Sequence, residues 1–287
     1  MKKFFKVILA FIKLSRIKVN SDEIILICSS GIGDTYFICA LSKEIEKRHK
    51  AKVSVLIKPQ HLPIAESFKK NLSRVIVFDE ALIKYTKLFG LRIKKGKFFY
   101  AHPGVIFYPR KIRFLGDKIN LLDSYKTLFK LSNAAILLEP NYKKITKVID
   151  IKNKKIAFLA PESSTAGELP LTFWGNVVDL LEKKGYDIII NSTKDKYLFG
   201  KNKTTLDLKD IPLIVEKSDL FISARSGISD LVAETTTKKI IIYNNHSWYD
   251  GTIFNGSSFK KMKFGKNIKE VIYKTANQTI KDISKII

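Results

Sequence analysis

The sequence predicts an α/β protein made of two doubly wound domains, each a parallel sheet with helices on both faces. Short apolar runs alternate with segments of helical periodicity, and this series occurs twice along the chain. A lysine-rich stretch at 142–155 separates the two series, and 287 residues suit two domains of ordinary size. We therefore expect an N-terminal helix at 1–20, one domain at 21–145 and a second at 146–287, with a ligand cleft between the domains.

The first series opens with the apolar run 23–28, which is typical of a parallel strand buried on both faces. A glycine-bearing turn follows it and leads into a segment with apolar residues at helical spacing. In chain order we expect strands at 23–28, 52–57, 74–78 and 97–101, and helices at 35–50, 59–70 and 80–94.

The second series repeats this pattern with strands at 155–159, 186–191, 204–206, 219–223 and 239–243, and helices at 172–184, 211–217 and 228–236. The last segment, 267–287, is predicted to be one long amphipathic helix that closes the fold. In open parallel sheets ligands bind beyond the carboxyl ends of the strands, so we expect functional residues in the loops that follow the strands.

The first twenty residues combine basic charge with apolar side chains at helical spacing. Their uninterrupted apolar run, 7–12, is too short for a signal-peptide core or for a membrane span of about 20 residues. Phenylalanines and isoleucines at 4, 5, 8, 11 and 12, with lysines and arginines between and after them, predict a basic amphipathic helix at the surface of an anionic membrane. The alternative is a helix packed on the protein's own surface.

The charge balance is strongly positive, with 52 lysines and arginines against 27 acidic residues and a formal net charge of +25. Such a field attracts anionic lipid, nucleic acid or diphosphate-bearing substrates. Joint enrichment in Lys, Ile and Asn also arises from AT-rich genomes whatever the function. The chain has no nucleic-acid-binding signature, so nucleic acid is not an expected partner. Cys28 and Cys39 lie in apolar runs, which favours a reducing compartment over a disulfide.

The loop after the first predicted strand contains Gly31, Gly33 and Asp34. The glycines let the backbone approach a ligand, and the N-terminus of the following helix offers free N–H groups. A carboxylate at Asp34 can take the proton from an attacking hydroxyl as a general base. The alternative is that Asp34 only caps the helix.

The loop after the first strand of the second domain contains Ser163, Ser164 and Thr165. Three hydroxyls in a loop of this kind can donate hydrogen bonds to a diphosphate. The alternative is an ordinary solvated turn.

A third loop follows the strand at 219–223 and leads into a helix. Arg225 carries a planar cation suited to phosphate, and Ser226 and Gly227 are placed to add donors. Glu234 is a candidate contact for a ribose or sugar hydroxyl. Asp230 either contacts the sugar or is an interior residue that holds Arg225. The alternative for Arg225 is a surface salt bridge.

The four histidines show no metal-ligand spacing, and the chain has no P-loop, no catalytic-triad motif and no convincing Asp-x-Asp metal motif. We therefore expect no metal and no cofactor. His102, after the strand at 97–101, is a candidate acceptor contact or a structural residue. His246, after the strand at 239–243, is a candidate neighbour of the donor.

Three segments, in this order, resemble the family-9 glycosyltransferases, the heptosyltransferase group of lipopolysaccharide assembly. IILICSSGIGDTYFICAL is similar to the family's opening strand and Gly-Asp turn. APESSTAGELPLTFWGNVVDLLEKKGYDIIINS is similar to the start of its donor domain. DLKDIPLIVEKSDLFISARSGISDLVAETTTKKIIIY is similar to the region around its donor loop.

The resemblance implies a GT-B fold, two Rossmann-like domains facing a central cleft, with metal-independent, inverting transfer from a nucleotide-sugar. It assigns Asp34 the role of catalytic base and places Gly227 in the donor loop. The chain departs from the family pattern at Arg225 and Asp230, and at Gly167, where a basic residue is expected. Our hypothesis is that Arg225 supplies the phosphate charge lost at Gly167.

We therefore predict a hexosyl- or heptosyltransferase whose acceptor is a lipid-linked, lipopolysaccharide or capsule glycan. The expected location is cytoplasmic, peripheral on the inner face of the cytoplasmic membrane. Two alternatives stay open. One is a nucleotide-sugar epimerase of the same fold, although the expected loops contain few of the carboxylates and histidines that epimerases use. The other is a non-catalytic binding protein derived from a transferase.

Overall fold

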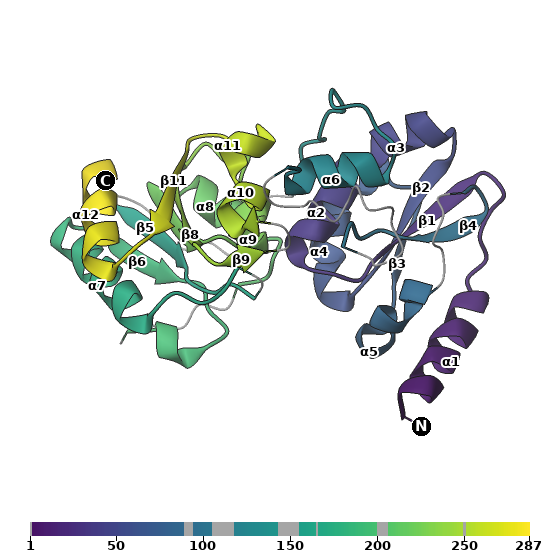
Figure 1. Ribbon diagram of the computed structural model, residues 1–287, viewed down its shortest axis with the longest axis horizontal. Helices are drawn as coiled ribbons and strands as arrows, with labels where there is room; N and C mark the ends of the chain where they lie inside the picture. The colour runs from purple at the N-terminus through teal and green to yellow at the C-terminus, as the bar shows by residue number, and fades with distance from the viewer. Residues whose placement is uncertain are drawn as a thin grey trace. The chain divides into compact units, whose positions relative to one another are not determined.

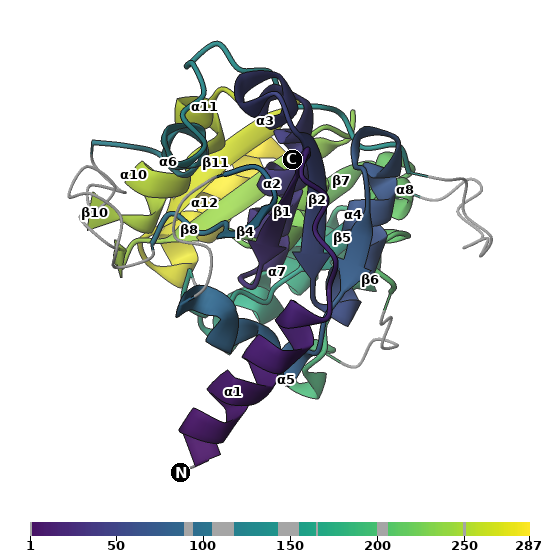
Figure 2. The same ribbon diagram turned by 90° about the vertical axis from the view of Figure 1, so that its right-hand side faces the viewer.

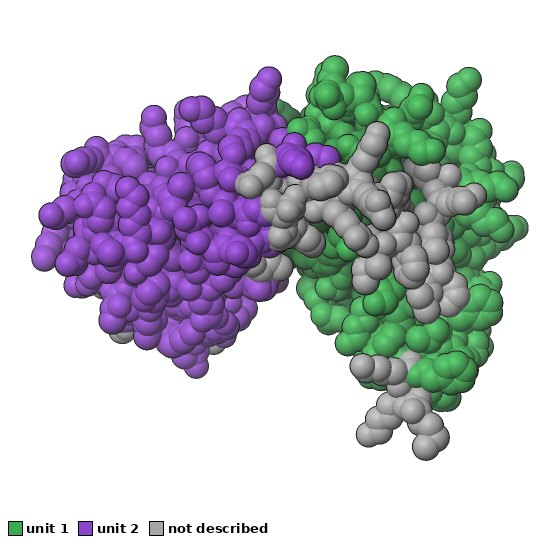
Figure 3. All heavy atoms as spheres, viewed as in Figure 1, with its two compact units in different colours: residues 1–113, 122–141 green, residues 114–121, 142–287 purple. Residues whose placement is uncertain are grey.

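The structure, a computed structural model, describes residues 2–88, 94–104, 118–142, 155–164, 166–199, 206–248 and 251–287. The chain forms two compact units (Figure 3). Unit 1 comprises Met1–Arg113 and Leu122–Asn141, and unit 2 comprises Phe114–Leu121 and Tyr142–Ile287. The expected boundary at 145 and most of the expected strand at 204–206 lie outside the described residues.

Unit 1 contains a four-stranded parallel sheet in the order β3-β2-β1-β4 (Figure 1). All six residues of the central strand β1 are buried, as expected for a strand covered on both faces. β1 runs alongside β2 with Cys28 opposite Ile57, so their carboxyl ends meet at one edge of the sheet. The strands are β1 (Glu23–Cys28), β2 (Lys52–Ile57), β3 (Val75–Val77) and β4 (Lys97–Tyr100).

Helices and short helical turns follow the strands of unit 1. They are α2 (Ile32–Ala40), α3 (Ser42–His49), η1 (Pro59–His61), α4 (Leu62–Ser67), η2 (Lys69–Asn71), α5 (Glu80–Ile83), η3 (Lys84–Leu88) and α6 (Leu121–Leu128). Side chains alternate across β1, so that Ile25 and Ile27 face a core shared with α1 and α5. Ile24 and Leu26 are buried toward the opposite face, and α2 packs on β1 and on α4.

The N-terminal helix α1 (Lys2–Ser15) belongs to unit 1 and packs against α5 and η3. Figures 1 and 2 show its N-terminal end extending away from the sheet of unit 1. Ala10 and Leu14 are buried in the core on that side of the sheet. Among the described residues, no helix combines the length and apolar character needed to cross a bilayer.

Unit 2 contains a five-stranded parallel sheet in the order β11-β8-β7-β5-β6 (Figure 1). Its strands are β5 (Ile156–Ala160), β6 (Asp187–Ile190), β7 (Leu220–Ala224), β8 (Lys238–Asn244) and β11 (Ile268–Tyr273). A two-stranded antiparallel ribbon, β9 (Ser247–Trp248) and β10 (Gly251–Thr252), follows β8. The central strands β5 and β7 are buried along their whole length.

The helical segments of unit 2 are α7 (Leu171–Lys183), η5 (Asp195–Tyr197), α8 (Ile211–Glu216), α9 (Gly227–Leu231), α10 (Ile253–Ser257), α11 (Phe259–Met262) and α12 (Ala276–Ile286). α7 and α12 pack on each other over one face of the sheet. Phe173, Trp174 and Ile283 fill the core below them. Trp174 therefore packs in the interior of unit 2.

Two helix predictions for unit 2 need correction. Residues 267–287 do not form one helix, because their first part is the edge strand β11, which pairs with β8, and α12 starts at Ala276. The expected helix at 228–236 is shorter, since α9 ends at Leu231 and turns follow it. Both differences depend on pairing and packing with neighbouring elements, which a local apolar pattern does not specify.

Candidate functional site

Asp34 lies just beyond the carboxyl end of β1, in the first turn of α2. Gly31 is the N-cap of this helix, and its N–H donates to Asp34 Oδ2 at 2.8 Å. The hydroxyl of Tyr125 donates to Asp34 Oδ1 at 2.5 Å. Gly33 is buried, whereas Asp34 is only partly buried. The carboxylate thus caps the helix and is also fixed and accessible, as a general base requires.

Tyr125 comes from α6 and is held by aromatic packing. Its side chain is fully buried, and its ring stacks on Phe129 with the centroids 6.2 Å apart. The ring of Phe37, from α2, lies 6.1 Å from that of Tyr125. The contacts that join α2 to α6 therefore also set the position of the hydroxyl that meets Asp34.

His61 and Lys58 follow β2 and lie beside the same turn. Nδ1 of His61 lies 2.8 Å from Thr35 Oγ1, and Lys58 Nζ donates to the carbonyl of Ser30 at 2.9 Å. Burial, together with the charge of Lys58, lowers the pKa of His61 to about 4. The imidazole is therefore neutral at pH 7, and Lys58 supplies the positive charge beside the loop.

On the other side of β1, the Ser29 hydroxyl donates to the hydroxyl of Tyr100 at 2.5 Å. Burial raises the pKa of Tyr100, so its phenol stays protonated at neutral pH. The carboxyl ends of β1, β2 and β4 thus each contribute polar groups to one edge. We call this set the unit 1 site: Ser29, Asp34, Lys58, His61, Tyr100 and Tyr125.

The sequence identified the Gly31–Asp34 turn but missed the other members of the unit 1 site. Lys58 directly follows a predicted strand and Tyr100 lies near the end of another, so strand position alone could have found them. Tyr125 lies 91 residues from Asp34, and no local pattern connects the two. Among the described residues, no hydrogen bond links His102 to the unit 1 site. Its Nδ1 accepts from the N–H of Gly104 within its own turn, in agreement with the structural alternative.

In unit 2, Arg225 follows β7 but points into the interior, with 4 % of its side chain exposed. Its Nη1 donates to Asp230 Oδ2 at 3.0 Å, and Nη2 lies 2.8 Å from Asp230 Oδ1. Nε donates to the carbonyl of Ser257 at 3.0 Å, and Nη1 donates to that of Ser226 at 2.8 Å. Asp230 thus takes the interior role that the sequence left open. The geometry does not favour the phosphate role expected for Arg225, because its donors are used inside unit 2.

Ser226 and Gly227 begin α9 at the carboxyl end of β7. Ser226 is the N-cap, and its N–H donates to Ser229 Oγ at 3.1 Å. Its own Oγ is buried and has no hydrogen-bond partner among the described residues. A buried hydroxyl in this situation calls for a ligand or water to complete its bonding.

The loops after β5 and β8 meet at Gly167, which lies in the first loop, and at Asn244 and His246, which lie at the end of β8 and just after it. Asn244 Nδ2 donates to the carbonyl of Glu168 at 3.3 Å. Gly167 has φ +75°, and a Cβ there would lie 2.9 Å from Asn244 Nδ2 and 3.3 Å from the His246 ring. The Nδ1 of His246 is buried and has no partner among the described residues. Ser226, with these three residues, forms what we call the unit 2 site, at the sheet edge where ligands of parallel sheets bind.

The loop after β5 is anchored by Glu162 and by the hydroxyl of Ser163. Glu162 accepts hydrogen bonds from Ser192 and from the backbone of Thr193 and Lys194, in the loop after β6. Ser163 is buried, and its Oγ accepts from the N–H of Ala166. Ser164 is exposed, and Thr165 lies outside the described residues. The structure therefore leaves Ser164 accessible and uses Ser163 within the loop.

Glu234 lies beyond the end of α9 and faces the loop before β11. Its Oε1 accepts from the N–H of Gly265 at 3.1 Å, and its Oε2 lies 3.3 Å from Lys266 Nζ. The expected contact with a ribose or sugar hydroxyl assumed a longer helix. With α9 ending at Leu231, the described contacts of Glu234 are structural.

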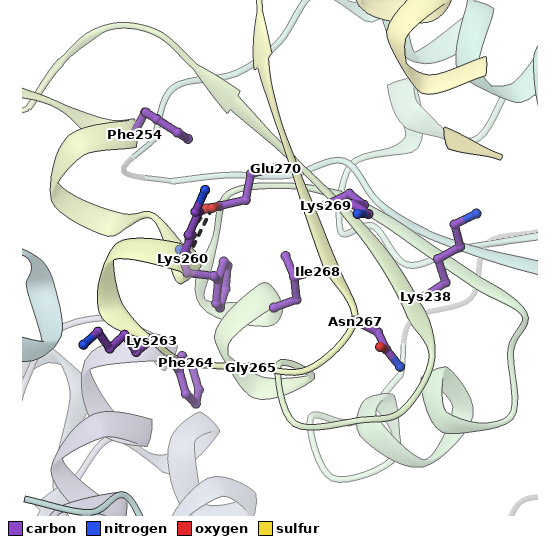
Figure 4. Close-up of a pocket in the computed structure, with 11 residues that line it drawn as sticks. Lys238, Phe254, Lys260, Lys263, Phe264, Gly265, Asn267, Ile268, Lys269 and Glu270 are labelled. Carbon is purple, nitrogen blue, oxygen red and sulfur yellow. Dashed lines mark hydrogen bonds between the residues drawn. The ribbon is translucent and has the colours of Figure 1, made fainter. Parts of the chain in front are cut away.

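A cavity of about 950 Å³ opens between α11 and β11 (Figure 4). Lysines and phenylalanines line it together with Glu270. The Glu270 carboxylate accepts from Tyr243 and Ser258 and from the first N–H groups of α11, so it caps that helix. Among the described residues, no group of three or more His, Cys, Asp or Glu side chains is placed to hold a metal ion.

No protein-family model and no curated protein matches the sequence significantly. Solved structures do match. The family-9 glycosyl transferase from Veillonella parvula DSM 2008 has a TM-score of 0.58 at 12% identity, over 94% of this chain and 91% of that one. The E. coli ADP-heptose LPS heptosyltransferase II has a TM-score of 0.58 at 11% identity, over 92% and 96%.

The iron-containing dodecameric glycosyltransferase TibC from enterotoxigenic E. coli H10407 has a TM-score of 0.57 at 14% identity, over 82% of this chain. The present chain spans 65% of the length of TibC. At these identities the likeness concerns the fold. The resemblance predicted from the sequence is thus confirmed at that level: the chain has the fold of the family-9 glycosyltransferases.

Proposed function

We propose that the protein is a glycosyltransferase that moves a sugar from a nucleotide-sugar donor to a glycan acceptor. The observation that carries this proposal is the Asp34 carboxylate, fixed by Gly31 and Tyr125 and yet partly exposed at the end of β1. A fold shared with glycosyltransferases supports the reaction class but does not by itself establish it.

In the proposed reaction Asp34 acts as general base. The acceptor hydroxyl gives its proton to the Asp34 carboxylate as its oxygen forms a bond to the anomeric carbon. The bond from that carbon to the nucleoside diphosphate breaks, and the diphosphate leaves with the electron pair. A single displacement of this kind inverts the anomeric configuration. We assign no metal ion to the reaction.

The unit 2 site is proposed to bind the donor. Ser226 Oγ and His246 Nδ1 are buried polar atoms suited to a polar ligand, and Gly167 lets backbone come close to it. A donor of the ADP-heptose class is one candidate, since the E. coli heptosyltransferase of similar fold is named for it. Arg225 and Asp230 replace the usual family residues and are paired with each other, which argues against heptose as the donated sugar.

The proposed acceptor is a lipid-linked, lipopolysaccharide or capsule glycan, and the proposed location is cytoplasmic, on the inner face of the cytoplasmic membrane. The net charge of +25 supports a place beside anionic lipid. The chemistry at Asp34 does not depend on this location.

Replacing Asp34 with Asn tests the proposal. Asparagine keeps the size of the side chain and an oxygen for the Gly31 N–H, but it is not a base. Sugar transfer should fall about a thousandfold, while nucleoside diphosphate binding stays unchanged. Glu139→Gln is the control, because Glu139 also belongs to unit 1 but not to the unit 1 site.

Retained transfer in Asp34→Asn would remove Asp34 as the base. Epimerisation of a nucleotide-sugar without transfer would favour the epimerase alternative. Nucleotide binding with neither reaction, across a panel of donors and acceptors, would favour a non-catalytic binding protein.

A further inference from the structure

Helix α1 has two separate apolar faces. The first is docked on unit 1, where Ala10 and Leu14 are buried in the core that includes Leu82 and Ile83 of α5. Leu9 packs against the same cluster. The helix is therefore held to unit 1 by its own apolar contacts.

The second face is exposed. Phe4 and Phe5 expose 72% and 61% of their surface, and Ile8 and Ile12 expose 39% and 40%. At 3.6 residues per turn, positions 4, 5, 8 and 12 form one stripe along the helix. We call these four residues the α1 stripe. Large apolar side chains rarely gather on the surface of a soluble protein unless something covers them.

Positive charge accompanies the α1 stripe. The first 21 residues contain six lysines and arginines and no acidic residue. Lys6 is exposed on α1, and Arg16 follows just after the helix. Lys13 forms an exposed ion pair with Asp79, the N-cap of α5, which adds a polar contact between α1 and unit 1. An apolar stripe beside unbalanced cations matches the surface of an anionic bilayer, with acyl chains below acidic headgroups.

We propose that the α1 stripe inserts into the interface of an anionic membrane while the opposite face of α1 stays docked on unit 1. The helix then acts as a fixed attachment rather than as a flexible tether. Unit 1, which contains Asp34, is thereby held in a fixed orientation relative to the bilayer. This inference names the element responsible for the membrane location and rests on that part of the proposed function, whereas lipid binding does not need the transfer reaction.

The experiment is vesicle co-sedimentation of the full chain. Vesicles of phosphatidylcholine alone are compared with vesicles of phosphatidylcholine and phosphatidylglycerol in equal parts, at low and high salt. We expect binding to the anionic vesicles that weakens as salt rises, because screening reduces the electrostatic part. The double substitution Phe4→Ser with Phe5→Ser should weaken this binding about a hundredfold, since two large apolar side chains no longer insert.

Ile136→Ser is the matched control. Ile136 also belongs to unit 1 and exposes 73% of its surface, but it lies far along the chain from α1. This variant should bind vesicles as the parent protein does. Thermal unfolding of all three proteins should agree, because the replaced side chains are exposed.

Two results would overturn the proposal. One is equal vesicle binding by the parent and the Phe4/Phe5 variant. The other is a parent protein that does not bind anionic vesicles but self-associates in light scattering, while the Phe4/Phe5 variant does not self-associate. The α1 stripe would then be a contact between copies of the chain. Since no sugar donor is present, either result leaves the Asp34→Asn test of transfer unaffected.

Discussion

The hydroxyl of Tyr125 donates a 2.5 Å hydrogen bond to Oδ1 of Asp34, so that α6 fixes a carboxylate at the end of the first strand of unit 1. Gly31 fixes the other oxygen through its N–H. The orientation of the proposed base therefore depends on a buried residue that would not itself touch a substrate. Tyr125 is a positioning residue in this arrangement.

Replacing Tyr125 with Phe should lower kcat for sugar transfer about tenfold to a hundredfold. A hydrogen bond to a charged group contributes about 1.5–3 kcal/mol, and without it the carboxylate can turn away from the attacking hydroxyl. KM for the donor should change little. Steady-state kinetics with varied donor and acceptor would measure the two effects.

Tyr142→Phe is the control for this prediction. Its hydroxyl donates to the carbonyl of Leu231 in unit 2, at 3.0 Å, and has no contact with Asp34 in the structure. If both variants lose the same activity, the effect is a general loss of a buried hydroxyl. In that case Tyr125 has no special role in transfer.

Acid should destabilise unit 1 through His61. Burial, with the charge of Lys58, lowers the pKa of His61 from 6.5 to about 4, so the unfolded chain binds a proton more readily than the folded one. His61 leaves the free energy of unfolding unchanged above about pH 6.5. The free energy of unfolding then falls as the pH drops from 6.5 toward 4, because there the unfolded chain binds the proton and the folded chain does not. This fall corresponds to about 3 kcal/mol of the free energy of unfolding.

Urea unfolding between pH 7 and pH 4 measures this effect. His61→Gln should be less stable than the parent at pH 7, because the contact with Thr35 changes, but its stability should fall less steeply with acid. His102→Gln should keep the slope of the parent. An unchanged slope in His61→Gln would show that other groups cause the acid sensitivity.

The sequence predicted most strands of both sheets because buried parallel strands are continuous apolar runs. The strands 23–28 and 52–57 were predicted with the bounds that the structure gives. The prediction of one helix at 267–287 was wrong because Ile268, Val271 and Ile272 fit the spacing of a helix as well as that of a strand. Pairing of these residues with β8 decides the outcome, and that pairing is not visible in the segment itself.

The site was predictable only where one loop contains it. The Gly31–Asp34 turn was found because a glycine-rich turn between strand and helix is a local pattern. Tyr125 reaches Asp34 through tertiary packing, so the sequence offered no sign of it. At Arg225 the loop pattern suggested a ligand contact, whereas the structure pairs the side chain with Asp230 inside unit 2.

Arg225→Ala should destabilise unit 2 by about 3–5 kcal/mol, because it leaves Asp230 buried without its cation. Thermal or urea unfolding measures this loss. Arg225→Met together with Asp230→Leu should restore much of the stability, since replacing both members of a buried ion pair by apolar residues is often tolerated. The double variant should also keep its affinity for nucleoside diphosphates. A large loss of that affinity in a folded double variant would instead support the phosphate role.

Gly167 and Gly185 form a matched pair for testing the unit 2 site. Both have positive φ, +75° and +76°, so alanine adds about 1 kcal/mol of backbone strain at either position. A Cβ at Gly185 meets nothing within 4 Å, whereas one at Gly167 would lie 2.9 Å from Asn244 Nδ2 and 3.3 Å from the His246 ring. Gly167→Ala must therefore displace these two side chains, but Gly185→Ala need not.

We expect Gly167→Ala to weaken nucleoside diphosphate binding about tenfold, which corresponds to about 1.4 kcal/mol, with Gly185→Ala unchanged. Isothermal titration on both proteins, after thermal unfolding confirms that each is folded, separates loss of the site from loss of stability. Equal affinities would mean that the approach of Asn244 and His246 to the loop after β5 does not shape the donor site. The donor would then have to be bound by other residues of unit 2.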